Sequence, residues 1–255
     1  MPSEAYDEVN KAWKSTTRVL FGEELGELKD YAPYLKEALI GKWVDSCFSG
    51  KKLWVASEEY HEKARFFDYQ TEGSKVASIA AKPIDINSIK DLDSLLEAVQ
   101  EKLIYSGNKA LGNSQHVEDS DAIVDSVSIL NSSNIVRSRY LAYAYLMREN
   151  EYTFGSTSSG QSSHIIRCFY NNTLKRCFEC CTSISSSDCY FSYNLLGCTN
   201  CMFTFNARSK KDQIGNVQLN RQQYDDLKNK LVGEMRDMLK KKKRFDPSIV
   251  DFLNS

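Results

Sequence analysis

The chain has 255 residues, of which 42% are hydrophobic and 26% are charged, and its formal net charge is −1. This length and composition suit a globular protein of one large or two medium domains, and they argue against intrinsic disorder and against a wholly basic nucleic-acid binder. The charge is unevenly spread, because residues 207–255 carry 12 Lys/Arg against 7 Asp/Glu. This excess indicates a basic C-terminal end that either faces a partner or is the solvated side of a helix.

Targeting and membrane-spanning segments are not apparent in the sequence. The N-terminus lacks a basic start followed by an apolar run, and the longest apolar stretch, Leu141–Met147, is far shorter than the roughly 20 residues of a membrane span. We therefore expect a cytoplasmic chain with no membrane association. In a reducing compartment its eight cysteines should be thiols or metal ligands rather than disulfides.

Residues 1–115 are predicted to form an α+β domain. A helix should begin near Ser3, because apolar residues then recur three or four positions apart. The elements expected after it are one or two helices over Glu23–Leu39, strands over Lys52–Ala56, Lys63–Tyr69 and Ser74–Ala81, and an amphipathic helix over Ile89–Tyr105. The polar composition between Gly107 and Ser120 then marks a domain boundary.

Residues 116–206 have a different sequence pattern, in which short strand-like stretches alternate with small polar clusters. A cysteine followed by a large apolar residue recurs at Cys168-Phe169, Cys177-Phe178, Cys189-Tyr190 and Cys201-Met202, and these cysteines are 9, 12 and 12 residues apart. A short, nearly fixed period is typical of a stacked repeat architecture, and cysteine packs well in a narrow interior. The pattern predicts a parallel β-solenoid (β-helix).

Residues 207–255 are predicted to cap this solenoid with an amphipathic helix and a basic tail. Asn220 can cap a helix that runs to about Lys243. Its apolar stripe consists of Tyr224, Leu227, Leu231, Met235, Met238 and Leu239. Because exposed strand edges promote aggregation, we expect this helix to cover one open end of the solenoid and the α+β domain to cover the other.

The second half of the chain resembles a known group of sequences. The Cys-aromatic units, the charged turn Asn206–Lys211, the segment Ile214–Val217 and the helix start Asn220–Tyr224 are similar to uncharacterised cysteine- and aromatic-rich repeat proteins of archaea, candidate bacterial lineages and their viruses. The similarity covers roughly residues 125–250. It implies a solenoid-like fold and no particular activity.

An alternative interpretation of the cysteines is a zinc site. The pairs Cys177/Cys180 and Cys198/Cys201 are separated by 17 residues, which lies within the spacing window of a zinc ribbon. The repeat accounts for Cys168, Cys181 and Cys189 as well, whereas the zinc motif does not. Buried repeat cysteines with no cofactor are therefore the preferred interpretation, and zinc remains the alternative.

Catalytic motifs are hard to find, and we expect the chain not to be an enzyme. Its histidines are His61, His116 and His164, and no serine lies in a nucleophile elbow. Between Glu151 and Asp212 the only acidic residues are Glu179 and Asp188, which is sparse for a solenoid that cleaves glycans.

Cations interleaved with aromatics favour a non-catalytic interaction protein, with RNA or a ribonucleoprotein such as the ribosome as partner. The candidate contact residues are Arg137, Arg139, Tyr140, Tyr143, Arg148, Arg208, Lys210, Lys211, Lys240, Lys241, Lys242, Lys243 and Arg244. A structural subunit of a virion or similar assembly is a further alternative, and it predicts self-association at micromolar concentration.

Overall fold

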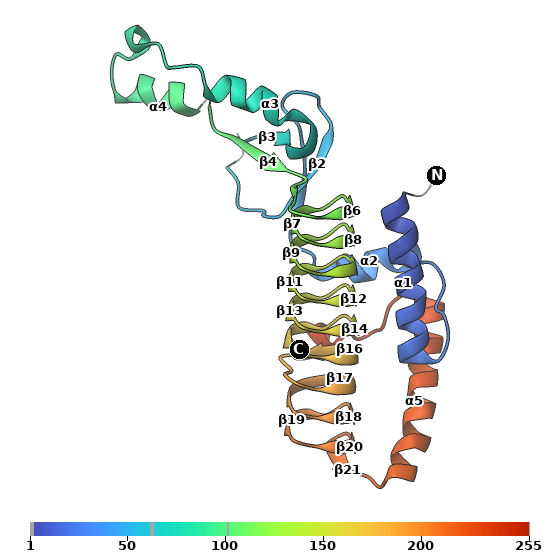
Figure 1. The fold of residues 1–255 in the computed structure, drawn as a ribbon. Coiled ribbons are helices and arrows are strands. Elements are labelled where there is room, and N and C mark those ends of the chain that lie inside the picture. The colour runs from blue at the N-terminus through green and yellow to red at the C-terminus, as the bar shows by residue number, and fades with distance from the viewer. Residues whose placement is uncertain (1–2, 62–63, 101, 255) are drawn as a thin grey trace.

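A computed structural model describes residues 3–61, 64–100 and 102–254. It contains an N-terminal helical segment, a small α/β unit, a long β-solenoid and C-terminal helices (Figure 1). The predicted fold class, an α+β start followed by a parallel β-solenoid and a C-terminal helix, is confirmed. No helix within the described residues is long and apolar enough to cross a membrane.

The N-terminal helical segment packs on the solenoid. Its elements are α1 (Glu4–Phe21), η1 (Leu28–Tyr31), α2 (Ala32–Leu35) and η2 (Lys36–Ala38). The helix expected near Ser3 is α1: Ser3 caps its start by accepting the Tyr6 N–H with its hydroxyl, and Gly22 caps its end in a left-handed conformation. This helix lies lengthwise along one side of the solenoid (Figure 1).

The α/β unit projects beyond the first coil as an arm (Figure 1). The strands β1 (Lys42–Asp45) and β2 (Lys52–Val55) pair antiparallel, and β3 (Arg65–Asp68) and β4 (Ile104–Gly107) pair parallel. The helical elements between β3 and β4 are α3 (Tyr69–Ala80), η3 (Ile86–Ser88) and α4 (Leu92–Gln100).

Two predictions in this arm need correction. The strand expected over Ser74–Ala81 lies in α3 and the turn after it, because Asp68 caps a helix start by accepting the Gln70 N–H and the following alanines favour the helix. The helix expected over Ile89–Tyr105 is shortened to α4, since the chain must extend at Ile104 to pair with β3. Lys63 and Glu101 lie outside the described residues.

The solenoid comprises about nine turns between residues 110 and 214. Equivalent residues of neighbouring turns pair in parallel with a shift of twelve, as where Leu141 pairs with Ile129 on one side and Thr153 on the other. Its strands are β5 (Ala110–Leu111), β6 (Gln115–Glu118), β7 (Asp121–Val124), β8 (Val127–Leu130), β9 (Ser133–Val136), β10 (Arg139–Ala142), β11 (Tyr145–Arg148), β12 (Glu151–Phe154), β13 (Thr157–Gly160), β14 (Ser163–Ile166), β15 (Phe169–Asn172), β16 (Lys175–Cys181), β17 (Ser187–Leu196), β18 (Thr199–Met202), β19 (Phe205–Arg208) and β20 (Lys211–Ile214).

Each turn has four corners, because almost every third residue adopts a positive φ. In one turn these corner residues are Tyr140, Tyr143, Leu146 and Glu149, with φ between 55° and 60°. The residue after each corner points inward, as Leu141, Ala144, Met147 and Asn150 do, and all four are buried. A twelve-residue turn therefore supplies four inward side chains, which explains the narrow interior.

Interior hydroxyl groups brace successive turns. The Ser132 hydroxyl donates to the Leu130 carbonyl at 2.8 Å and accepts the Ala144 N–H of the next turn at 3.1 Å. The same pair of bonds recurs at Ser126, Ser138, Ser156, Ser162 and Ser186. These bonds satisfy corner backbone groups that the ladder leaves unpaired and make the stack stiff.

The C-terminal helix lies beside the stack rather than across its open end. After β20, β21 (Val217–Gln218) turns back and pairs antiparallel over the last turn, which covers the strand edge. α5 (Arg221–Lys242) then returns along the side that also carries α1, and α6 (Ile249–Leu253) follows (Figure 1). The helix takes this course because the outward aromatics of β16 and β17 need cover, and its buried residues Tyr224, Met235 and Leu239 join that cluster.

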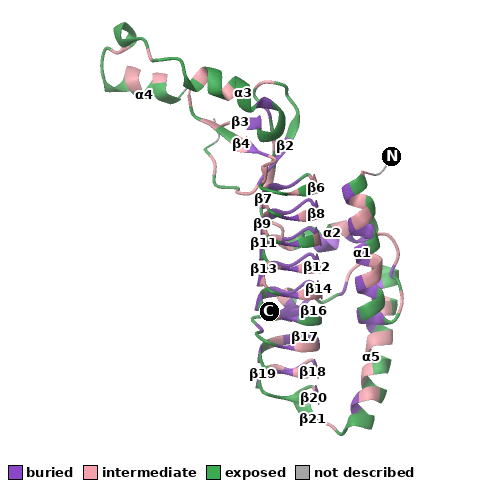
Figure 2. Cartoon of the chain, in the orientation of Figure 1, coloured by how far each residue is buried: buried purple, intermediate pink, exposed green. Residues whose placement is uncertain are grey.

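The sequence-based boundaries at residues 115 and 206 therefore differ from the arrangement observed. The solenoid begins at Ala110 and ends at Ile214, and α1 from the predicted N-terminal domain belongs to its flank. The buried residues lie mainly along the solenoid and the helices beside it, whereas the outer arm is largely exposed (Figure 2).

Candidate functional site

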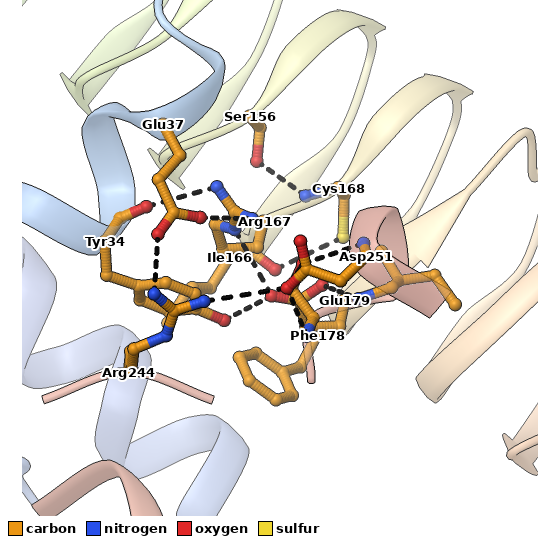
Figure 3. A network of polar contacts seen from close by, with 12 residues as sticks. Tyr34, Glu37, Ser156, Ile166, Arg167, Cys168, Phe178, Glu179, Arg244 and Asp251 are labelled. Atoms are coloured by element: carbon orange, nitrogen blue, oxygen red, sulfur yellow. Dashed lines mark hydrogen bonds and ion pairs between the residues drawn. The ribbon is translucent and has the colours of Figure 1, made fainter. Parts of the chain in front are cut away.

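A buried polar network joins the N-terminal segment, two solenoid turns and the C-terminal tail (Figure 3). Arg167 and Glu179 occupy the same corner of adjacent turns, with side chains 1% and 0% exposed, and their Nε and Oε1 atoms lie 3.2 Å apart. Tyr34 donates to Glu179, and the Ile249 N–H donates to its other oxygen at 2.8 Å. The Arg167 guanidinium also contacts Glu37 at 3.0 Å.

The electrostatics of this network indicate a structural role. Burial raises the pKa of the Glu179 carboxyl, and the neighbouring Arg167 charge opposes that rise. Burial likewise raises the pKa of Tyr34 well above its ordinary value. Both Glu179 oxygens are bonded to groups of the chain itself, so the carboxylate is arranged to hold three segments together.

The four thiols of the proposed zinc alternative do not meet at one point. Cys177 and Cys201 stand in the same column two turns apart, with Cys189 between them. Two turns correspond to about 9.6 Å, whereas two thiolates on one zinc ion lie within about 4.6 Å of each other. Among the described residues, the group that brings three possible ligand atoms within 4.8 Å of one another is Glu4, Glu8 and His116.

The histidines in the solenoid are engaged in local contacts. His116 lies at a corner beside α1, where its Nδ1 is 2.9 Å from Glu8 and its Nε2 is 3.6 Å from Glu4. The hydrogen bond to Glu8 raises the pKa of the imidazole. His164 also lies at a corner and stacks on Tyr152, with ring centroids 4.6 Å apart.

The predicted RNA-contact residues of the middle turns are largely paired with acids. Arg137 lies 2.5 Å from Glu149, and Arg139 lies 2.8 Å from Glu151. Arg148 approaches Glu149 only at 3.8 Å, and its side chain is 70% exposed. Two of the predicted aromatics are covered: Tyr143 is buried, and Tyr140 packs against the Tyr152 ring.

The basic run at the end of α5 is also engaged within the chain. Lys240 lies 2.8 Å from Glu23, and Lys242 lies 3.2 Å from Asp246. Lys243 sits over the Tyr31 ring, and Arg244 contacts Glu37 and Asp251. Lys241 is exposed, as are Arg208, Lys210 and Lys211 on the last turns. The predicted residues are thus spread over several places and do not form one basic surface.

One side of the solenoid is not covered by α1 or α5, and we call it the open face. It is formed by the outward residues of β11, β13, β15, residues 181–184, the second half of β17, and β19, on the side away from α1 and α5 (Figure 1). Its exposed members are Leu146, Arg148, Tyr170, Asn172, Thr182, Ile184, Asn194, Leu196, Asn206 and Arg208. These strand segments contain no Asp or Glu.

The register arranges these side chains in straight rows. Asn172, Ile184, Leu196 and Arg208 pair in sequence from one turn to the next. Beside that row, a groove of about 630 Å³ runs along Tyr145, Phe169 and Tyr170 towards α6. Arg148 and Arg208 were predicted from the sequence, whereas Tyr170 and the three asparagines were not. The twelve-residue spacing of Tyr170, Thr182, Asn194 and Asn206, and of Asn172 with Ile184, Leu196 and Arg208, was the signal that could have revealed them.

The chain is a β-solenoid repeat protein with many buried cysteines and aromatic clusters. No protein-family model matches it, and no curated protein matches it significantly.

Proposed function

We propose that the chain is a non-catalytic platform that binds single-stranded RNA, free or within a ribonucleoprotein, on the open face. The observation that carries this proposal is the composition of that face, whose strand segments present arginine, tyrosine and asparagine side chains and contain no Asp or Glu, with Glu149 3.8 Å from Arg148 at its edge. Phosphates attract arginine, bases stack on exposed aromatic rings, and amides hydrogen-bond to base edges. A β-sheet surface with exposed aromatics suits unpaired RNA better than a duplex.

The dimensions of the open face fit an extended strand. Arg148 and Arg208 occupy equivalent positions five turns apart, because they are separated by 60 residues at twelve residues per turn. At the spacing of parallel strands this corresponds to about 24 Å, long enough for several nucleotides between two phosphate contacts. Tyr170 lies between them and is 66% exposed. Lys210 and Lys211 extend the positive charge past Arg208.

Stiffness supports the same function. The face belongs to strands whose turns are braced by interior hydrogen bonds, so little conformational entropy should be lost when a ligand binds. A pre-organised surface gains affinity from modest contacts because these contacts need not order the protein first.

The proposal predicts a specific loss of binding when the open-face cations are removed. Binding of a fluorescent single-stranded RNA is measured by anisotropy over a range of salt concentrations. The slope of log K against log salt is about −0.7 for each neutralised phosphate, so Arg148→Ser with Arg208→Ser should flatten it by about 1.4. Tyr170→Ala should weaken binding by about 1–3 kcal/mol through lost stacking.

The matched control is Arg139→Ser with Arg176→Ser, which changes the net charge equally but removes cations that are paired with acids off the open face. This control should bind as the parent chain does. Equal weakening by both double variants would assign binding to overall charge, and an absence of RNA binding would refute the partner class. Self-association of the chain without RNA binding would instead support a structural subunit of an assembly.

We also propose that the chain belongs with the cysteine- and aromatic-rich repeat proteins that its second half resembles. The repeat, the charged turn and the following helix support this, since they form the last turns, β21 and α5. A reducing, cytoplasmic location is proposed because all eight cysteines are free thiols.

A further inference from the structure

Six cysteines form a continuous row of thiols inside the solenoid. Each is no more than 1% exposed, and together with Ile165, Leu174, Leu195 and Ala207 they make one interior cluster. Cys181 differs from them because it points outward and joins the cluster beneath the helices. The strand register orders the thiols along the row as Cys168, Cys180, Cys177, Cys189, Cys201, Cys198.

Neighbouring thiols of the row lie either on adjacent turns or on the same turn. Cys168 and Cys180 stack across adjacent turns, as do Cys177, Cys189 and Cys201, whereas Cys177 and Cys180, and likewise Cys198 and Cys201, are inward residues of one turn. No three of these sulfur atoms lie within 4.8 Å of one another, since among the described residues that criterion selects Glu4, Glu8 and His116. The arrangement is therefore a line and not a cluster.

A line of thiols suits two-coordinate metal ions. Cys189 and Cys201 pair directly across neighbouring turns, so equal side-chain conformations place their sulfur atoms about 4.8 Å apart. A linear S–metal–S unit with bonds of about 2.3 Å spans about 4.6 Å. Tetrahedral zinc requires four converging ligands, whereas a soft monovalent ion needs only the two sulfurs that flank each gap.

We propose that the thiol row binds soft monovalent cations, with Cu(I) or Ag(I) as the chemical class, one ion in each gap between neighbouring sulfurs. Six thiols in a row have five gaps, so the row holds five ions. Each ion forms bonds to two sulfurs and displaces one thiol proton to solvent, and the charge of the interior is unchanged. That balance avoids the cost of placing net charge in a buried site.

Native mass spectrometry of the full reduced chain, titrated with Ag(I) without oxygen, tests the stoichiometry. The background variant Cys47→Ser with Cys181→Ser removes the exposed thiol and the outward thiol while leaving the row intact. Five bound ions are expected. Cys198→Ser in this background shortens the row at its end and should leave four.

Cys189→Ser cuts the row in the middle and should leave three ions, because rows of three and two thiols have two gaps and one. Circular dichroism checks that each variant stays folded. Cys189→Thr is a second substitution in case Cys189→Ser does not fold, because Thr153 shows that threonine fits the same interior column. Equal losses for Cys189→Ser and Cys198→Ser, no uptake in the background variant, or uptake only with loss of the β-sheet signal would each overturn the proposal.

Discussion

The Arg167–Glu179 pair shows that the contribution of an ion pair to stability depends on how deeply the pair is buried. A buried ion pair is held by its partners at a high desolvation cost, and removal of one partner leaves an uncompensated charge in the interior. Arg176 and Asp188 are separated by the same twelve residues and lie 2.6 Å apart, but the Arg176 side chain is 46% exposed. The two pairs therefore share a geometry and differ in burial.

Arg167→Met should destabilise the chain by about 3–5 kcal/mol at neutral pH, because Glu179 is then buried without its counter-charge. Arg176→Met is the control and should cost about 0–1 kcal/mol, because solvent screens the exposed pair. Denaturant unfolding of both variants and the parent chain measures these differences. Equal losses for the two variants would contradict the structural role of the network.

The loss of stability caused by Arg167→Met should also depend on pH in a defined direction. Burial raises the pKa of Glu179 in the folded chain, so the stability associated with its neutral form is lost as pH rises through that raised pKa. Removal of Arg167 raises the pKa further. The penalty of Arg167→Met should therefore shrink as pH falls below the ordinary glutamate pKa of about 4.3, because the carboxyl is then neutral in both the folded and the unfolded state. A penalty that is constant with pH would contradict this.

Among the elements, α2 depends on a single corner of the solenoid. Tyr143, Gly155 and Arg167 occupy the same corner of successive turns with φ of 55°, 60° and 55°, so the backbone there accepts side chains. At Gly155, however, an added Cβ would lie 3.0 Å from both the Cα and the carbonyl oxygen of Leu35. The glycine is required by the close approach of α2 and not by the corner itself.

Gly155→Ala should therefore displace α2 and destabilise the chain by about 1–3 kcal/mol. Gly197→Ala is the control, because it has the same left-handed backbone and its nearest neighbour, the Ser209 hydroxyl, is 3.9 Å from the added Cβ. Thermal unfolding of both variants separates the clash from the shared backbone cost. Equal shifts would mean that α2 does not hold its position against this corner.

The sequence predicts elements best where one residue type repeats. The Cys-aromatic units marked the later turns, whereas the earlier turns hold Ile129, Leu141 and Thr153 in one interior column and show no repeated letter. The amphipathic stripe of α1 predicted a helix, but a stripe does not say which surface it will cover. For that reason the boundary at residue 115 assigned α1 to a separate domain.

The open face was partly predictable for a related reason. Arg148 and Arg208 were selected as cations, and the structure leaves them exposed, but Arg137 and Arg139 were selected on the same grounds and are paired with acids. Which outward column stays uncovered depends on where α1, α5 and α6 pack. That is a property of tertiary structure, and charge patterns along the chain do not contain it.

At the scale of the whole molecule, α1 and α5 cover different turns of the solenoid. α1 packs along β6, β8, β10, β12, β14 and β16, and α5 packs against β20 and meets α1. In a stacked repeat each turn contacts mainly its neighbours, so stability is distributed along the axis and not pooled in one core. Loss of one helix contact should therefore loosen the turns beneath that helix more than the others.

Trp13→Ala tests this division. The Trp13 side chain is 1% exposed, lies 5.3 Å from the Phe154 ring, and donates its indole N–H to the Gly26 carbonyl, so its truncation should cost about 3–5 kcal/mol. Hydrogen exchange followed by mass spectrometry should show faster exchange in β6–β14 and little change in β18–β20. Tyr224→Ala on α5 should give the reverse pattern at about 3–5 kcal/mol, because Tyr224 is fully buried in the first turn of the helix, where Arg221 contacts Asp212 of the last solenoid turn. Uniformly faster hydrogen exchange in both variants would contradict this. It would show that the solenoid and its helices unfold as one cooperative unit, in which α1 and α5 do not stabilise different turns.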